Sequence, residues 1–213
     1  MIVDDHGVVR DGLQLLLEQH EDMEIVAQAP DGRQAVKMAA TVFPDVILMD
    51  VSMPGLNGIE ATAQIIKDNP QIKVLALSAH SNKRFVTDIL KSGAHGYLLK
   101  DCITEELFRA IDAVKNGERY LCSKVAGVII DNYIDGQGQG AGRASINSLT
   151  AKERELLQLL VEGLCTKEIA RMLHLSIKTV DGRRRDIMNK LEMNSLAELT
   201  KFAIREGVTN LDF

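Results

Sequence analysis

The sequence has no tryptophan, and aromatic residues make up only 4% of its 213 positions. Apolar residues still reach 46%, so the core has to be built from aliphatic side chains. No apolar run approaches the roughly 18 residues that a membrane-spanning helix needs. The N-terminus also shows no basic region followed by an apolar stretch, which is the pattern of a secretory signal. We therefore expect a cytosolic protein with no membrane partner.

Cysteine is equally scarce. The three cysteines, Cys102, Cys122 and Cys165, are odd in number, and their spacing fits neither a metal site nor a redox motif. We expect all three to be reduced packing residues. The length of the chain predicts two domains, or one large one.

Positive charge is in deficit overall but is unevenly distributed. The net charge is -5; residues 1–133 carry 13 basic against 19 acidic residues, whereas residues 148–213 carry 11 against 10. Three of the later basic residues, Arg183 to Arg185, are consecutive. Only the C-terminal part is therefore suited to approach a polyanion.

Short apolar segments alternate with helical patterns over the first 120 residues. The repeat of about 20–25 residues is typical of parallel β-α units. We predict an α/β domain over residues 1–120, with a doubly wound, five-stranded parallel sheet. The strand candidates are Ile2–Asp5, Glu24–Ala29, Asp45–Asp50, Val74–Ala79 and Gly96–Lys100, and the helical patterns are Val8–Gln19, Gly32–Thr41, Ile59–Asn69, Lys83–Lys91 and Glu105–Asn116.

A glycine-rich stretch separates this domain from the rest of the chain. Residues Asp135–Ser148 read DGQGQGAGRASINS and show no apolar periodicity, so ordering them would cost more entropy than burial returns. Before them, Ser123–Ile134 has the pattern of one short helix. We predict that residues 121–147 form a helix and a flexible linker.

Helical patterns alone fill residues 148–213, which we predict to be an all-α domain of four helices. Thr150 and Glu153 have the spacing of a capping box at the start of the first helix, and Ser176 is placed to cap the third. The second and third helices are joined by a tight connection, as in a helix-turn-helix. The predicted helices are Thr150–Gly163, Thr166–Leu173, Ile177–Leu191 and Ala197–Glu206.

Four of the five predicted strands end in residues that can do chemistry. Asp4 and Asp5 end the first strand, Asp50 the third, Ser78 the fourth and Lys100 the fifth. The carboxyl ends of parallel strands lie along one edge of a sheet, where open α/β folds bind ligands. A single strand-end Asp could equally cap the next helix, but the group as a whole favours one shared site.

Three carboxylates at one edge would repel one another without a cation. Oxygen ligands that leave room for water suit Mg²⁺. A carboxylate beside Mg²⁺, a lysine and a hydroxyl group is the apparatus for accepting a phosphoryl group as an aspartyl phosphate. Asp50 is therefore the candidate phosphoacceptor.

Residues 1 to about 120 resemble the receiver domain of two-component response regulators, which has a flavodoxin-like fold. The motifs that carry the resemblance are IVDDH, LMDVSMPGLNG, LALSAH and GYLLK. The resemblance implies that Mg²⁺ is ligated by Asp5, Asp50 and the backbone carbonyl of Ser52, with Asp4 acting through water.

The resemblance also implies a switch. The Ser78 hydroxyl moves to the phosphoryl group, the Tyr97 ring turns inward behind it, and Lys100 supplies a fixed positive charge. Many receivers have a cis-proline after the lysine, whereas here Asp101 follows, and a cis bond to a non-proline residue costs roughly 3 kcal/mol.

Two further points bear on this interpretation. Only Met1 to Val3 precede the acid pair, fewer residues than receivers usually have, so we expect residues upstream of Met1. Phosphatases of the haloacid dehalogenase type also use a strand-end Asp, a hydroxyl and a Lys, but they have a second Asp two residues after the nucleophile. Ser52 occupies that position here, which argues against the phosphatase.

Residues 148–208 resemble the LuxR-type DNA-binding domain of the NarL/FixJ class. The matching segments are LTAKERELLQLLVEGLCTKEIARMLHLSIKTV and NKLEMNSLAELTKFAI. The resemblance implies that the third helix enters the major groove and that the last helix pairs two copies. The apolar side of the last helix could serve that pairing or the core; it consists of Leu196, Leu199, Phe202 and Ala203.

Periodicity divides the third helix into two faces. Val180, Ile187 and Leu191 recur on the core face. Arg185 is the best candidate for a base contact because its planar fork matches guanine O6 and N7, whereas Lys178, Thr179, Arg183 and Arg184 suit phosphates or the edge of the interface. The residues expected on the DNA side are Lys178, Thr179, Asp181, Gly182, Arg183, Arg184, Arg185 and Asn189.

These features together predict a regulator rather than an enzyme. We expect a transcription factor that accepts a phosphoryl group from a sensor histidine kinase and then changes the dimerisation or exposure of its DNA-binding domain. Its partners would be the kinase, double-stranded DNA and a second copy of the chain. The alternative is a constitutive DNA-binding protein with a vestigial receiver, against which the intact acid cluster argues.

Overall fold

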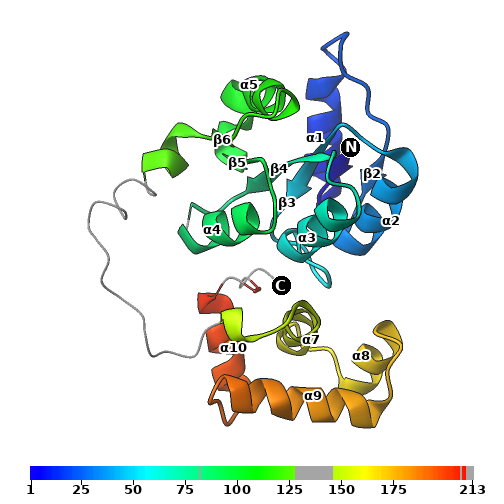
Figure 1. Ribbon diagram of the computed structural model, residues 1–213, viewed down its shortest axis with the longest axis vertical. Helices are drawn as coiled ribbons and strands as arrows, with labels where there is room; N and C mark the ends of the chain where they lie inside the picture. Colours follow the sequence, from blue (N-terminus) through cyan, green and yellow to red (C-terminus); the bar gives the residue numbers. More distant parts are fainter. Residues whose placement is uncertain (82, 128–145, 207, 210–213) are drawn as a thin grey trace. The chain divides into compact units, whose positions relative to one another are not determined.

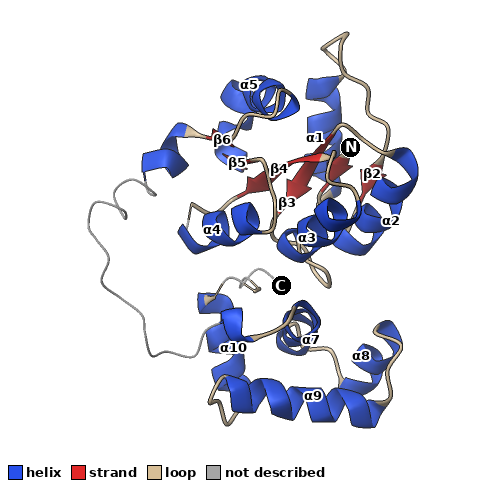
Figure 2. Ribbon diagram, in the orientation of Figure 1, coloured by secondary structure: helices blue, strands red, loops and turns tan. Residues whose placement is uncertain are grey.

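A computed structural model of the chain describes residues 1–81, 83–127, 146–206 and 208–209. Two compact units divide the chain, Met1–Gln137 and Gly138–Phe213. The first unit contains both strands and helices, whereas the described part of the second unit contains helices and no strand (Figure 2). None of the described helices combines the length and the apolar character required to cross a membrane.

A single parallel sheet forms the centre of the first unit. Its order is β2-β1-β3-β4-β5-β6, and each neighbouring pair is parallel. The doubly wound parallel sheet is thereby confirmed, with six strands instead of the predicted five. The strands are β1 (Ile2–Val3), β2 (Gln28–Ala29), β3 (Val46–Asp50), β4 (Lys73–Ser78), β5 (Gly96–Leu99) and β6 (Tyr120–Leu121).

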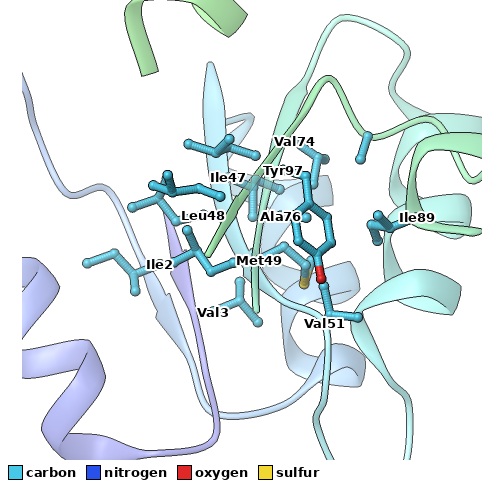
Figure 3. Packing of buried hydrophobic residues seen from close by; sticks show 14 of the residues in the cluster. Ile2, Val3, Ile47, Leu48, Met49, Val51, Val74, Ala76, Ile89 and Tyr97 are labelled. Carbon is cyan, nitrogen blue, oxygen red and sulfur yellow. The ribbon is translucent and has the colours of Figure 1, made fainter. Parts of the chain in front are cut away.

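Helices cover both faces of the sheet. Figure 1 shows α1 and α5 on one face and α2, α3 and α4 on the other. The central strands are buried almost throughout, because each is covered on both sides. Figure 3 shows the Tyr97 ring among buried strand residues such as Ile47 and Met49. The helices are α1 (Gly7–Leu17), α2 (Gly32–Val42), α3 (Gly58–Asp68), α4 (Lys83–Lys91) and α5 (Ile103–Lys115).

Two predicted strands are shorter than expected, and one was missed. Of the predicted strands Ile2–Asp5 and Glu24–Ala29, only the two-residue strands β1 and β2 form. These two strands pair with each other through Ile2 with Gln28 and Val3 with Ala29. The missed strand is β6, held to β5 by the Cys122 amide, which donates to the Tyr97 carbonyl at 3.1 Å.

The peptide bond after Lys100 and the segment after β6 were two further points of the sequence analysis. No peptide bond of the described residues is cis, including the bond between Lys100 and Asp101. Residues 123–127 are helical, in agreement with the start of the predicted helix Ser123–Ile134. The rest of that helix and most of the linker lie outside the described residues, so the boundary at residues 121–147 stays a prediction.

The described part of the second unit contains four α-helices, as predicted. The Thr150 hydroxyl accepts from the Glu153 amide, and the Glu153 carboxylate accepts from the Thr150 amide, so the capping box is confirmed. Leu156, Ile169 and Phe202 belong to its core. A short 3-10 helix, Ile146–Ser148, precedes α7 (Ala151–Val161), α8 (Thr166–Met172), α9 (Ile177–Lys190) and α10 (Leu196–Arg205).

Candidate functional site

The sheet brings the predicted site residues to one edge. Asp4 follows β1, Asp50 ends β3, and these two strands are hydrogen-bonded neighbours. Ser78 ends β4, which lies on the other side of β3. The side chains at these three strand ends are almost fully buried, with exposed fractions of 0% for Asp4, 2% for Asp50 and 0% for Ser78.

Lys100 lies between two of the carboxylates. Its Nζ is 2.7 Å from Asp4 Oδ2 and 3.1 Å from Asp50 Oδ2. Burial alone would lower the pKa of Lys100, but the two carboxylates outweigh burial and the pKa is raised. The lysine is therefore a permanent cation at this edge of the sheet.

The carboxyl group of Asp50 is electrostatically disfavoured in its charged form. Burial raises its pKa to about 6, with the Asp4 carboxylate adding to the rise and Lys100 opposing it. A second positive charge near Asp50 would relieve this penalty, since an opposite charge favours the ionised form.

The residues around Asp50 fit a divalent cation. Asp4, Asp5, His6 and Asp50 each offer one ligand atom, and these atoms all lie within 4.8 Å of one another. Asp5 Oδ1 is buried without a hydrogen-bond partner among the described residues, and His6 Nδ1 lies 3.0 Å away. An orphaned buried oxygen in a carboxylate cluster is chemically suited to a hard cation such as Mg²⁺.

The loop after β3 depends on two glycines. Gly55 has a φ of 79°, a conformation that other residues rarely adopt. A Cβ on Gly58 would lie 2.0 Å from the Asp50 carbonyl oxygen. The helix that follows is capped by Asn57, whose side chain accepts from the Glu60 amide at 3.0 Å. Asp50 is therefore not the cap of α3, and its side chain is left for the site.

Ser52 and Ser78 contact the site through different atoms. The Ser52 amide donates to Asp50 Oδ1 at 3.4 Å, a long hydrogen bond. The Ser78 hydroxyl accepts from the His80 amide at 3.0 Å.

Tyr97 is turned inward, with 0% of the residue exposed. Its hydroxyl donates to the His80 carbonyl at 2.5 Å. Burial raises the pKa of Tyr97 to about 12, against the lowering effect of a hydrogen bond with Ser78. The Tyr97 and Ser78 hydroxyl groups thus both contact the backbone of His80, in the segment that follows β4.

The structure adds one residue to this group that the sequence analysis did not include. His6 follows the acid pair directly and occupies the N-cap position of α1, and its Nδ1 is 3.3 Å from Asp4 Oδ1. The signal in the sequence was the residue type, since imidazole is a common metal ligand. His6 does not end a strand but stands at the N-cap position of α1, so the pattern of strand ends does not indicate it.

The third helix of the second unit, α9, shows the two expected faces. Val180, Ile187 and Leu191 are buried, and the Ser176 hydroxyl caps the helix by accepting from the Thr179 amide at 3.0 Å. Of the residues predicted to face DNA, four are exposed (Lys178, Thr179, Arg185 and Asn189) and four are half-buried (Asp181, Gly182, Arg183 and Arg184).

The apolar side of α10 belongs mainly to the core. Leu199, Phe202 and Ala203 are buried in the hydrophobic cluster of the second unit. Leu196 is 41% exposed. Of the two roles that the sequence left open, core packing describes the first three residues, and only Leu196 remains on the surface.

Comparison with known proteins finds a family match for each of the two parts of the chain. Residues 1–112 match the family described as the response regulator receiver domain, and residues 147–203 match the bacterial regulatory proteins of the luxR family. The oxygen regulatory protein NreC of Staphylococcus carnosus (strain TM300) is 36% identical, over 100% of this chain and 99% of that protein. NreC of Staphylococcus aureus (strain MRSA252) is 37% identical over 97% of this chain and 96% of that protein.

Solved structures of response regulators also match nearly the whole chain. A structure of the Salmonella typhimurium RcsB response regulator has a TM-score of 0.59 at 26% identity and covers 94% of this chain and 95% of that one. The response regulator ChrA of a heme-sensing two-component system has a TM-score of 0.53 at 31% identity and covers 98% and 96%. The chain therefore belongs to the NarL/FixJ family of response regulators, which join a receiver domain to a LuxR-type DNA-binding domain and regulate transcription in response to phosphorylation.

Proposed function

We propose that Asp50 is the phosphoacceptor of this regulator and that a sensor histidine kinase is its donor. The observation that carries the proposal is the position of the Asp50 carboxylate, 2% exposed at the end of β3, with Lys100 Nζ 3.1 Å away. One Asp50 oxygen attacks phosphorus, the bond from phosphorus to the donor's imidazole nitrogen breaks, and that nitrogen keeps the electron pair. The pKa of about 6 leaves Asp50 mostly ionised at neutral pH, as a nucleophile requires.

Other residues of the chain prepare this step. Lys100 offsets negative charge as the phosphoryl group arrives, and Ser78 offers a hydroxyl donor to it. Asp5, Asp50 and the Ser52 carbonyl would hold Mg²⁺, with Asp4 acting through water. When bound, Mg²⁺ neutralises charge on the carboxylates and the phosphoryl oxygens. The orphaned Asp5 Oδ1 supports this assignment.

The phosphoryl group is strong enough to operate a switch. It adds about -1.5 to -2 charge and one to three charge-assisted hydrogen bonds, each worth roughly 1.5–3 kcal/mol. Moving a two-state equilibrium from 1:99 to 99:1 needs about 5.5 kcal/mol. We therefore assign the conformational change to the Ser78 hydroxyl and to the segment after β4 that it shares with Tyr97, whose ring is already turned inward.

The acceptor is tested by labelling the full chain with a small-molecule phosphodonor and Mg²⁺. We expect an acid-stable, base-labile adduct that Asp50→Asn abolishes. Asp45→Asn is the matched control, because Asp45 is an exposed carboxylate just before the same strand. Undiminished labelling of Asp50→Asn would show that another residue is the acceptor. Failure of the parent to be labelled would favour the constitutive regulator with a vestigial receiver.

We also propose that α9 is the helix that contacts DNA. Arg185 is exposed on the side opposite the buried Val180 and Ile187, and we assign it to a base edge. Lys178, Thr179, Arg183 and Arg184 are assigned to phosphates or to the edge of the interface. The Thr179 hydroxyl lies 2.7 Å from the Ser176 hydroxyl, so it also serves the helix cap.

Arg185 is tested on a duplex selected from a randomised pool by the phosphorylated full chain. Arg185→Ala should weaken binding to this duplex by about 1–3 kcal/mol and relax sequence choice. Lys201→Ala removes an exposed cation from α10 and serves as the control. Both proteins are titrated at several salt concentrations on the selected and on a scrambled duplex. Equal losses on the two duplexes would make Arg185 a phosphate contact, and unchanged affinity would remove it from the interface.

Dimerisation completes the proposal. One recognition helix makes few contacts, so two copies on adjacent half-sites are needed for useful affinity. A solved structure of RcsB contains two dimers bound to two parallel DNAs. We expect phosphorylation to strengthen dimerisation and DNA binding together, which sedimentation velocity with and without phosphodonor measures.

A further inference from the structure

The imidazole of His6 lies at the opening of the proposed cation site. Its Nδ1 is 3.0 Å from Asp5 Oδ1 and 3.3 Å from Asp4 Oδ1, and the side chain is 68% exposed. His6 occupies the N-cap position of α1, but its side chain makes no capping hydrogen bond. The backbone amide of His6 instead donates to Asp4 Oδ1 at 2.8 Å. The local fold therefore holds the Asp4 carboxylate through the backbone of His6 and leaves the imidazole at the cluster.

These spacings match the edges of a coordination octahedron. Ligand atoms about 2.1 Å from a cation lie about 3.0 Å apart when they are adjacent in an octahedron. The separations of 3.0 and 3.3 Å from His6 Nδ1 to the two carboxylate oxygens are close to that value. Asp5 Oδ1, the nearer of the two oxygens, belongs to the cation site of the proposed function, so an ion bound there can also reach His6 Nδ1.

A nitrogen ligand changes which cation such a site prefers. Oxygen-only sites suit Mg²⁺, whereas imidazole favours transition metals, with affinity rising from Mn²⁺ through Co²⁺ to Ni²⁺. We propose that His6 Nδ1 is a ligand of this site and that the receiver binds a divalent transition metal, of the Ni²⁺ or Mn²⁺ kind, more tightly than Mg²⁺. This inference rests on the cation site assigned under the proposed function.

A different role for His6 predicts the opposite change in metal affinity when the imidazole is removed. If the imidazole is a cation that pairs with Asp4 and Asp5, it competes with every metal ion at the site. Removing it would then raise the affinity for Mg²⁺ and Ni²⁺ together. If it is a ligand, removing it lowers the affinity for Ni²⁺ and leaves that for Mg²⁺ nearly unchanged, because Mg²⁺ keeps its oxygen ligands.

Calorimetric titration of the full chain, without an affinity tag, separates these outcomes. MgCl₂ and NiCl₂ are titrated into the parent, His6→Gln and His174→Gln, the last removing an exposed imidazole from the other unit. Loss of an outer-shell partner already costs about 10- to 100-fold in metal affinity, so His6→Gln should cost at least about tenfold for Ni²⁺. His174→Gln should bind both metals as the parent does.

Spectroscopy gives a readout independent of affinity. Mn²⁺ bound to the parent should show electron spin-echo modulation from an imidazole nitrogen, and His6→Gln should lose it. A Ni²⁺ to Mg²⁺ preference unchanged in His6→Gln, or a joint rise in both affinities, would overturn the inference while leaving the Mg²⁺ site of the proposed function in place. Failure of the parent to bind Mg²⁺ at all would overturn that site and this inference with it.

Discussion

Replacing the phosphoacceptor by its neutral isostere should stabilise the receiver. In Mg²⁺-free buffer at pH 7 we expect Asp50→Asn to raise the free energy of unfolding of the first unit. The Asp50 carboxyl group is buried, and its pKa rises from 3.8 to about 6 in the folded chain. Asparagine removes the buried charge, while Lys100 keeps its 2.7 Å contact with Asp4.

The magnitude follows from the shift in pKa. A difference of about two pH units at 1.36 kcal/mol each corresponds to about 3 kcal/mol. The folded chain binds the Asp50 proton more tightly than the unfolded chain does, so stability falls as the pH rises from 3.8 through 6. The parent should therefore lose about 3 kcal/mol, relative to the variant, between pH 4 and pH 7.

Urea unfolding followed by tyrosine fluorescence measures this difference. All three tyrosines, Tyr97, Tyr120 and Tyr133, belong to the unit Met1–Gln137, so the signal does not report on unfolding of the second unit. With a slope of about 1–3 kcal/mol per molar urea, 3 kcal/mol shifts the midpoint by about 1–3 M. Asp45→Asn, at the exposed Asp45, controls for the general loss of a carboxylate. A variant no more stable than the parent at pH 7, or a gap of the same size at pH 4, would refute the reasoning.

Two further predictions concern Lys100 and Gly182. Lys100→Ala should still bind Mg²⁺, because the carboxylates remain, but its DNA affinity should no longer respond to phosphodonor. A duplex titration with and without donor checks this, and a response equal to that of the parent would deny Lys100 a switching role. Gly182→Ala should raise the stability of the second unit by about 1 kcal/mol, since, apart from its chain neighbours and the adjacent backbone of its own helix, no described atom lies within 4 Å of the added Cβ. Thermal unfolding followed by circular dichroism checks this, with Gly12→Ala in α1 as the control, because Gly12 is equally open.

The sequence predicts the interior strands and the helix starts well, because their causes are local. Continuous burial marks β3 and β4, and side-chain caps at Thr150 and Ser176 fix where helices begin. The edge strands were predicted poorly. The segment Glu24–Ala29 pairs only at its last two residues, because β1 offers only Ile2 and Val3 as partners. The length over which two strands pair depends on both segments, so the sequence of either segment alone does not predict it.

The same distinction applies to the site. Residue types at strand ends were enough to group Asp4, Asp50 and Lys100, because a parallel sheet brings such ends to one edge. Two facts needed coordinates. One is that Asn57 caps α3 and so releases Asp50 from that role. The other is that His6, which belongs to no strand, reaches the acid pair.

The unequal strand lengths of the sheet also bear on solubility. Both edge strands, β2 and β6, have two residues, as does the interior strand β1, whereas β3, β4 and β5 have four to six. A long free edge is a template on which another chain can add a strand and start aggregation. The short β6 covers part of β5 and offers little edge of its own. A change that extended β6, or detached it and uncovered β5, would therefore make the receiver prone to edge-to-edge association.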